Sequence, residues 1–196
     1  KVIDTENLQS NKENDGDRRQ QWSVYERFMK ASDKMGVECI AMLQIEQRRK
    51  QNLLIYENVV STMENKQQRM LFHGTSFENV EKIIVNGFNR DFNIHARYGK
   101  GTYFAKSPRY AAKYAKKEGK SGALALLACR CIVGKSGLGK RDMAESELYD
   151  KDNPDQQYDS LVDDLKNPQL YVINRDYHAV PLYVILFRYK DHANKH

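Results

Sequence analysis

Two short apolar runs, each beside a polar residue, constrain this chain more than any other feature. Residues 70–72 (MLF) lead into His73 and Gly74, and residues 102–105 (TYFA) carry Tyr103 near their start, after a Gly-Lys-Gly turn at 99–101. Each run has the length and apolar character of a buried strand. Glycine after the histidine lets a backbone or a ligand approach closely, because no side chain intervenes. We expect the runs to bring His73 and Tyr103 together, although a half-buried histidine at a strand end also fits the first run alone.

The segment after the second run predicts a helix that supplies aromatic groups to the same place. Ser107 is a suitable N-cap, and Pro108 suits the first helical position. The pattern predicts a helix over 109–117, on which Tyr110 and Tyr114 lie four residues apart and share a face. A histidine, two or three tyrosines and backbone amides would then converge on one cleft.

Composition indicates one globular domain. The chain has 196 residues, of which 40% are hydrophobic, and a formal net charge of +6. No apolar run reaches membrane-spanning length, and no signal peptide is seen; because the chain begins with lysine, we expect a fragment of a longer protein. The basic residues are spread among acidic ones, with the densest cluster at 48–50, so that nucleic-acid binding lacks a motif.

Cysteine usage favours a reducing compartment, the cytosol or nucleus. Three cysteines, Cys39, Cys129 and Cys131, do not make a disulfide framework. Cys129 and Cys131 alternate on an apolar run and should point to one buried face. Neither they nor the five histidines have the spacing of zinc ligands, so no metal is expected.

The rest of the chain alternates between helical and strand patterns. We expect a polar linker or disordered tail over 1–20 and a folded domain over 21–196 that begins with an amphipathic helix near Trp22. Thr75 and Glu78 suggest a capping box for a helix that ends at Gly87. Other expected elements are strands over 37–43, 123–133, 170–173 and 182–189, an apolar helical stripe from Ile45 through Leu53, Tyr56 and Val60 to Met63, and loops over 88–98 and 134–155.

Five segments together resemble a known family. They are 71–75 (LFHGT), 98–105 (YGKGTYFA), 158–160 (YDS), 167–173 (NPQLYVI) and 180–185 (VPLYVI). They resemble the catalytic domain of poly(ADP-ribose) polymerases, the diphtheria-toxin-like ADP-ribosyltransferases, and within it the mono-ADP-ribosylating members. The resemblance implies an α+β fold: two packed, mostly antiparallel sheets with flanking helices around an NAD cleft.

The resemblance also implies roles for individual residues. His73 would bond the adenosine ribose of the co-substrate NAD, the Gly74 backbone would hold the nicotinamide carboxamide, and Tyr103 and Tyr114 would lie on the two sides of the nicotinamide. His95 in the loop over 88–98 would reach the pyrophosphate together with Arg97, unless both are exposed residues without a role. The NAD-binding set is completed by Thr75, Tyr98, Phe104, Ala105 and Ala111.

Two positions depart from the family pattern. The polymerising enzymes have glutamate where this chain has Leu170, and leucine cannot activate a ribose hydroxyl for chain extension. A catalytic set of His73, Tyr103 and Leu170 is of the His-Tyr-aliphatic type, which implies single transfers. Ala111 replaces a serine that bonds the carboxamide, which would weaken NAD binding several-fold to about tenfold.

The expected function is therefore NAD-dependent mono-ADP-ribosylation of a protein side chain, on itself or on a partner. The alternative is a catalytically silent domain that keeps the fold and serves as a binding or scaffolding module. For the isolated domain we expect a monomer with no membrane association.

Overall fold

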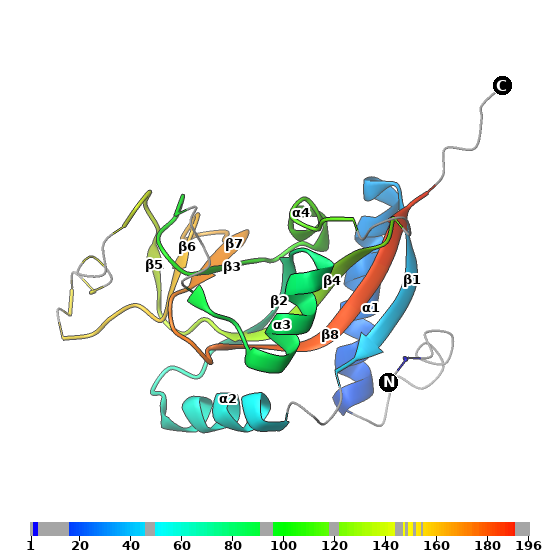
Figure 1. Ribbon diagram of the computed structural model, residues 1–196. Coiled ribbons are helices and arrows are strands. Elements are labelled where there is room, and N and C mark those ends of the chain that lie inside the picture. The colour runs from blue at the N-terminus through cyan, green and yellow to red at the C-terminus, as the bar shows by residue number, and fades with distance from the viewer. Residues whose placement is uncertain are drawn as a thin grey trace.

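The computed structural model describes residues 2–3, 16–45, 50–90, 96–117, 122–143, 147, 149–150, 152–153 and 155–190, and it confirms the expected α+β class (Figure 1). The helices are α1 (Gly16–Met35), α2 (Lys50–Thr62), α3 (Phe77–Asn86) and α4 (Pro108–Ala112). The strands are β1 (Val37–Gln44), β2 (Gln68–Gly74), β3 (Thr102–Ala105), β4 (Leu124–Ile132), β5 (Ser136–Leu138), β6 (Ser160–Val162), β7 (Leu170–Ile173) and β8 (Ala179–Tyr189).

The strands pair in one continuous order, β1-β8-β4-β2-β3-β7-β6-β5. All neighbours are antiparallel except β5 and β6. The β2–β3 junction consists of a single pair, Phe72 with Ala105, whereas β2 pairs with β4 from Gln68 to Gly74. The two expected sheets are thus two halves of one order, joined at a seam between β2 and β3.

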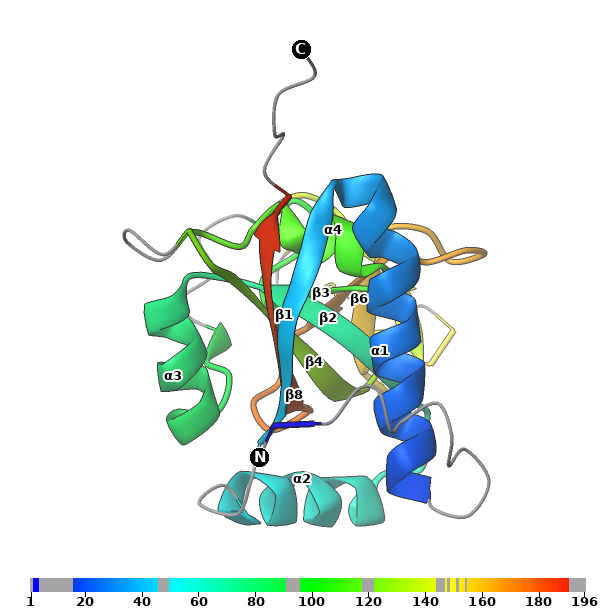
Figure 2. The same cartoon turned by 90° about the vertical axis from the view of Figure 1, so that its right-hand side faces the viewer.

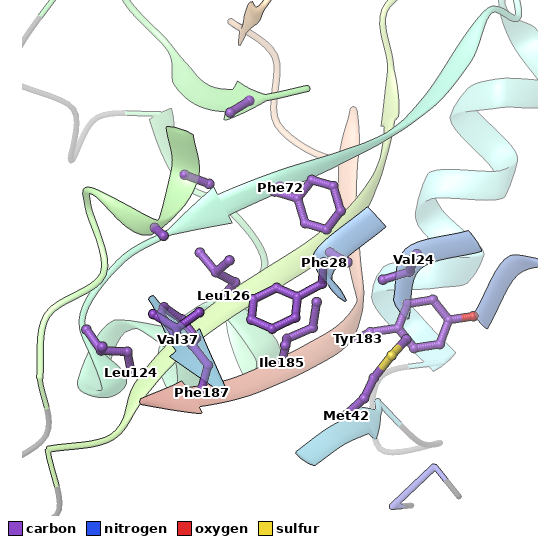
Figure 3. Packing of buried hydrophobic residues seen from close by; sticks show 14 of the residues in the cluster. Val24, Phe28, Val37, Met42, Phe72, Leu124, Leu126, Tyr183, Ile185 and Phe187 are labelled. Atoms are coloured by element: carbon purple, nitrogen blue, oxygen red, sulfur yellow. The ribbon is translucent and has the colours of Figure 1, made fainter. Parts of the chain in front are cut away.

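Helices cover both faces of the larger half, as Figure 2 shows for α1 and α3. On β4, Leu124 and Leu126 belong to the core under α1, and Ala125 and Leu127 belong to the core under α3. This explains the near-continuous apolar sequence of β4, because a strand buried on both faces has no polar side. Under α1, the rings of Phe28 and Phe187 lie 5.6 Å apart and hold the centre of the cluster (Figure 3).

The expectation that Cys129 and Cys131 point to one buried face is confirmed in this core. Cys129 and Cys131 are fully buried and share the cluster under α3. All three cysteines are free thiols. In the described part of the chain, no helix has both the length and the apolar character needed to cross a membrane.

The start of the domain differs from the expected tail over 1–20. Helix α1 already begins at Gly16, and the side-chain oxygen of Gln20 accepts bonds from Arg130 and Tyr183. Ile3, buried to 9% exposure, donates its N–H to the carbonyl of Met42. Hydrophobic periodicity missed these first turns because polar groups attach them to the sheet. The boundary of the catalytic domain itself stays a prediction.

Two further segments were wrongly bounded. The predicted helix over 109–117 ends at Ala112, because the Lys116 N–H donates to the Thr75 carbonyl and draws the chain back to the end of β2. The predicted loop over 134–155 contains β5, which pairs with β6 through a parallel backbone ladder. The hydroxyls of Ser136 and Ser160, 2.7 Å apart, add a side-chain bond between the two strands.

The caps of α3 are partly as expected. Ser76, and not Thr75, is the N-cap, and its hydroxyl accepts the Asn79 N–H. Gly87 ends the helix at φ 82°, as predicted. The apolar stripe on α2 is confirmed at Tyr56, which is 1% exposed, whereas Ile45 lies ahead of the helix.

A single arginine spans the seam between the two halves. Arg27 of α1 donates to the Met70 carbonyl of β2 at 2.9 Å and to the Lys106 carbonyl, just after β3, at 2.5 Å. Its guanidinium also lies 4.6 Å from the centroid of the Phe72 ring. Burial lowers its pKa, yet an arginine of this kind stays charged at every physiological pH.

We expect Arg27→Ala to lower the free energy of unfolding by about 1–3 kcal/mol, because two carbonyls at the seam lose their donor. Urea denaturation measures the change. The matched control is Lys30→Ala on the same helix, whose exposed pair with Glu26 should contribute at most about 0.5 kcal/mol. Equal effects of the two substitutions would show that Arg27 does not hold the seam.

Candidate active site

His73 lies at the seam, on the face of the sheet opposite to the face that Arg27 covers. Its Nδ1 lies 2.8 Å from the carbonyl oxygen of Tyr103. A carbonyl can only accept, so Nδ1 carries the proton and Nε2 of the neutral ring is an acceptor. The ring packs against Phe88 and Phe104, with centroids 5.2 and 5.5 Å away. Burial lowers the pKa of His73, although its bond to Tyr103 opposes the shift, and the ring is therefore neutral near pH 7.

Tyr103 is fixed by the glycine turn that precedes it. Its hydroxyl accepts the Tyr98 N–H at 2.8 Å and donates to the Gly99 carbonyl at 2.9 Å. Gly101 has φ 148°, and a Cβ there would lie 2.6 Å from the carbonyl oxygen of Ile173. The turn thus requires glycine. Its two hydrogen bonds to the hydroxyl fix the orientation of the Tyr103 side chain. Burial raises the pKa of Tyr103, so the hydroxyl keeps its proton.

The structure explains why glycine stands at position 74, which the sequence alone did not reveal. A Cβ at this position would lie 1.9 Å from the backbone oxygen of Ala111. Its lack of a side chain therefore lets α4 pack directly on the end of β2. Ala111 itself is 2% exposed and belongs to the core under α1.

A cluster of tyrosines surrounds this contact. The rings of Tyr110 and Tyr114 lie 5.9 Å apart, so their predicted shared face is confirmed even though Tyr114 follows the helix in a turn. A hydrogen bond between the two raises the pKa of Tyr110 to about 12. Tyr114 is 59% exposed. Burial is the main cause that raises the pKa of Tyr103, and electrostatic interactions with Tyr98 and Tyr114 raise it further. Four tyrosines therefore lie within electrostatic range of one another.

Leu170 lies in the core rather than on an open surface. It begins β7, pairs with Ala105 and is 5% exposed. Because Ala105 also pairs with Phe72, the three apolar side chains lie side by side on the face under α1. The backbone N–H of Leu170 donates to Oδ1 of Asp163 at 3.0 Å, so that one oxygen of the neighbouring carboxylate is bonded to the backbone of this position.

The remaining candidates have different surroundings. Phe104 and Ala105 are buried at 0% and 3% exposure and support the site from within. The Thr75 hydroxyl is bonded by the Asn79 amide, and the exposed Arg97 lies over the Tyr98 ring at 5.4 Å. His95 lies outside the described residues. Among the residues that the structure covers, no group of histidine, cysteine, aspartate and glutamate could hold a metal ion.

Sequence reasoning missed two residues that build the site, Arg27 and Phe88. Arg27 resembles any charged residue on an amphipathic helix, and nothing in its spacing indicates carbonyl partners. Phe88 had a detectable signal, because a lone aromatic directly after the helix-ending Gly87 is well placed to pack back on the domain.

The comparisons with known proteins agree with this geometry. The overall fold matches the crystal structure of the PARP domain of Arabidopsis RADICAL-INDUCED CELL DEATH1 with a TM-score of 0.72, at 20% sequence identity, over 86% of this chain and 98% of that one. The likeness establishes an ADP-ribosyltransferase fold. Residues 21–188 match the family model described as the poly(ADP-ribose) polymerase catalytic domain, and the chain belongs to this family.

Curated relatives refine the placement. The chain is 35% identical over 131 residues to protein mono-ADP-ribosyltransferase PARP14 of Homo sapiens and 34% identical over 135 residues to PARP10 of Mus musculus. These matches take in 65% and 63% of this chain but only 7% and 13% of the relatives. A third relative, at 32% identity over 127 residues, is the probable inactive poly [ADP-ribose] polymerase SRO2 of Arabidopsis thaliana.

Replacing Gly74 by alanine should destabilise the protein by about 3 kcal/mol, because the new Cβ forces α4 away from β2. Thermal unfolding followed by circular dichroism tests this. Gly16→Ala is the control, since nothing lies within 4 Å of a Cβ at that position, and it should be neutral or slightly stabilising. A tolerated Gly74→Ala would mean that α4 does not rest on this contact.

His73 should be neutral, with its proton on Nδ1, at pH values where a free histidine is already charged. Its folded pKa lies below the unfolded value of about 6.5. The unfolded chain consequently binds more protons at acidic pH, and the stability contributed by the neutral ring is lost as the pH falls below about 6.5. Nitrogen-15 NMR of the imidazole would read both properties. A titration midpoint at or above the free value, or a proton on Nε2, would contradict them.

Proposed function

We propose that this protein is an NAD-dependent mono-ADP-ribosyltransferase that modifies protein side chains. The family and its mono-ADP-ribosyltransferase relatives support the class of activity. The observation that carries the proposal is the link between His73 and Tyr103. It places a neutral imidazole acceptor beside the backbone of a tyrosine whose hydroxyl is fixed by the glycine turn, at the point where β2 and β3 separate.

The residues at the seam suit a planar cationic nicotinamide and its ribose. In this proposal His73 Nε2 accepts a hydrogen bond from the adenosine ribose, and the backbone of Gly74 contacts the carboxamide. Tyr103 and the half-exposed Tyr114 lie on the two sides of the ring, an arrangement that favours a cation. We propose that the remaining residues of the NAD-binding set are Thr75, Arg97, Tyr98, Phe104, Ala105 and Ala111.

The reaction would break the bond between nicotinamide and ribose. The bonding electrons leave with the nicotinamide, which departs as a neutral base, and positive charge develops on the ribose as in glycoside hydrolysis. An acceptor atom of a protein side chain then bonds to the same ribose carbon and loses its proton. The π-faces of Tyr103 and Tyr114 stabilise the developing charge.

Leu170 limits the reaction to a single transfer. Its side chain is apolar and buried, and the adjacent Asp163 is already bonded to the backbone of Gln169 and Leu170. The position at the start of β7 thus has no carboxylate of its own to activate a ribose hydroxyl for elongation. We propose mono-transfer for this reason, with His73, Tyr103 and Leu170 as the catalytic set.

A silent, scaffolding domain is the second candidate. Ala111 cannot bond the carboxamide, and a relative is described as probably inactive. NAD binding separates the two functions, since a scaffold need not bind it.

We further propose that residues 21–196 are the catalytic domain, that this domain is a monomer and that it can modify itself. We also propose a cytosolic or nuclear location, and the three free thiols support this location.

Incubation with NAD should add single ADP-ribose units to the protein, seen by intact mass spectrometry. His73→Ala and Tyr114→Ala should lower the yield by about 10²-fold or more, because both remove contacts that position the substrate. Tyr149→Ala is the control, since Tyr149 is an exposed tyrosine paired with Gln157 outside this site. A ladder of long chains would contradict the role given to Leu170, and no NAD binding by calorimetry would favour the scaffold.

A further inference from the structure

The segment that forms the site is rich in cations and has no carboxylates. Residues 96–117 contain seven basic residues and no aspartate or glutamate, although the formal net charge of the whole chain is only +6. The expectation that basic residues are spread among acidic ones is wrong for this segment. All seven are exposed: Arg97, Lys100, Lys106, Arg109, Lys113, Lys116 and Lys117.

Several exposed cations elsewhere in the described structure have acidic partners. On α1, Lys30 lies 3.0 Å from Glu26, and Lys190 lies 3.3 Å from Asp33 of the same helix. Similar pairs join Lys82 with Glu78, Lys135 with Asp150 and Arg188 with Glu38. Within the part of the chain that the structure describes, no carboxylate forms an ion pair with any of the seven cations of 96–117.

Four of these cations lie on α4 and the turn after it, and we call them the α4 patch: Arg109, Lys113, Lys116 and Lys117. The patch is next to the tyrosine cluster, because Lys113 Nζ lies 5.2 Å from the centroid of the Tyr110 ring and Tyr110 contacts Tyr114. A ligand held on the patch would therefore have its neighbouring atoms beside the proposed nicotinamide site.

We propose that the α4 patch binds an acidic segment of the protein acceptor, an inference that rests on the proposed function for the identity of the partner. Unpaired cations gain more from an anionic partner than cations that must first leave an internal carboxylate. The patch thus supplies the charge complementarity for a chain of glutamate or aspartate side chains, and it directs the acceptor to the site.

The geometry favours an acidic peptide over a single-stranded nucleic acid. Nucleic-acid strands bind by stacking bases on open aromatic faces. Here Lys113 lies over Tyr110 and Lys117 lies 5.7 Å from the centroid of Tyr189, so that a cation covers one face of each of these two tyrosines. Carboxylates need only the charges.

The test measures binding of a fluorescent peptide of alternating glutamate and serine by anisotropy. The triple variant Arg109→Glu, Lys116→Glu, Lys117→Glu leaves Lys113 and the tyrosines in place. We expect it to weaken binding at least about tenfold. The control variant Arg18→Glu, Arg19→Glu, Lys66→Glu has the same net charge, with two changes at the far end of α1 from α4 (Figure 2), and should stay within about twofold.

Several outcomes would overturn the proposal. They are no binding of the acidic peptide by the unaltered chain, an equal loss in the control variant, undiminished binding of a glutamine-for-glutamate peptide, or tighter binding of a single-stranded oligonucleotide on the same patch. The matching glutamine substitutions, Arg109→Gln, Lys116→Gln, Lys117→Gln, repeat the test if charge reversal prevents folding. NAD binding by calorimetry is measured separately, so that peptide binding without NAD binding rejects the proposed function and keeps the patch.

Discussion

The structure depends on a seam with a single backbone pair. Phe72 and Ala105 alone join the two halves of the sheet, and two side chains reinforce the joint, Arg27 on one side and His73 on the other. Where the backbone ladder is missing, each of these side chains donates a hydrogen bond to a carbonyl across the gap, because buried carbonyls need a donor. The proposed catalytic histidine is therefore also a structural fastener, and its substitution will affect the position of Tyr103 as well as the substrate contact.

Much of the fold followed from local patterns, and the parts that did not have physical causes. Strands 170–173 and 37–43 were readable because buried strands leave apolar runs, and Gly87 marked the end of α3 because its left-handed backbone favours glycine. The predicted α4 was too long, because the hydrogen bond from the Lys116 N–H to the Thr75 carbonyl is a tertiary contact that helix propensity does not describe. The first turns of α1 and strand β5 were missed since polar groups hold them, and hydrophobic periodicity does not register such bonds.

Several residues that the sequence singled out lie close together in the structure, but the contacts that hold them there were not predicted. Tyr103 and the glycine turn were placed correctly together, yet only the structure shows that the turn bonds the hydroxyl from both sides. Gly74 was expected to make room for a ligand, whereas its missing Cβ makes room for Ala111. The polar groups of the site are thus held mostly by backbone atoms, which sequence patterns of side chains describe poorly. Their roles toward NAD stay predictions.

The contact of Ile3 with β1 has a consequence for the behaviour of shortened chains. Strand β1 ends the sheet, and the Ile3 N–H covers the Met42 carbonyl on its outer side. An uncovered sheet edge is a template on which another chain can add a strand. A protein cut ahead of α1 would keep its α4 patch and its tyrosines but present this edge to solvent, and it would tend to self-associate at the concentrations that crystallisation requires.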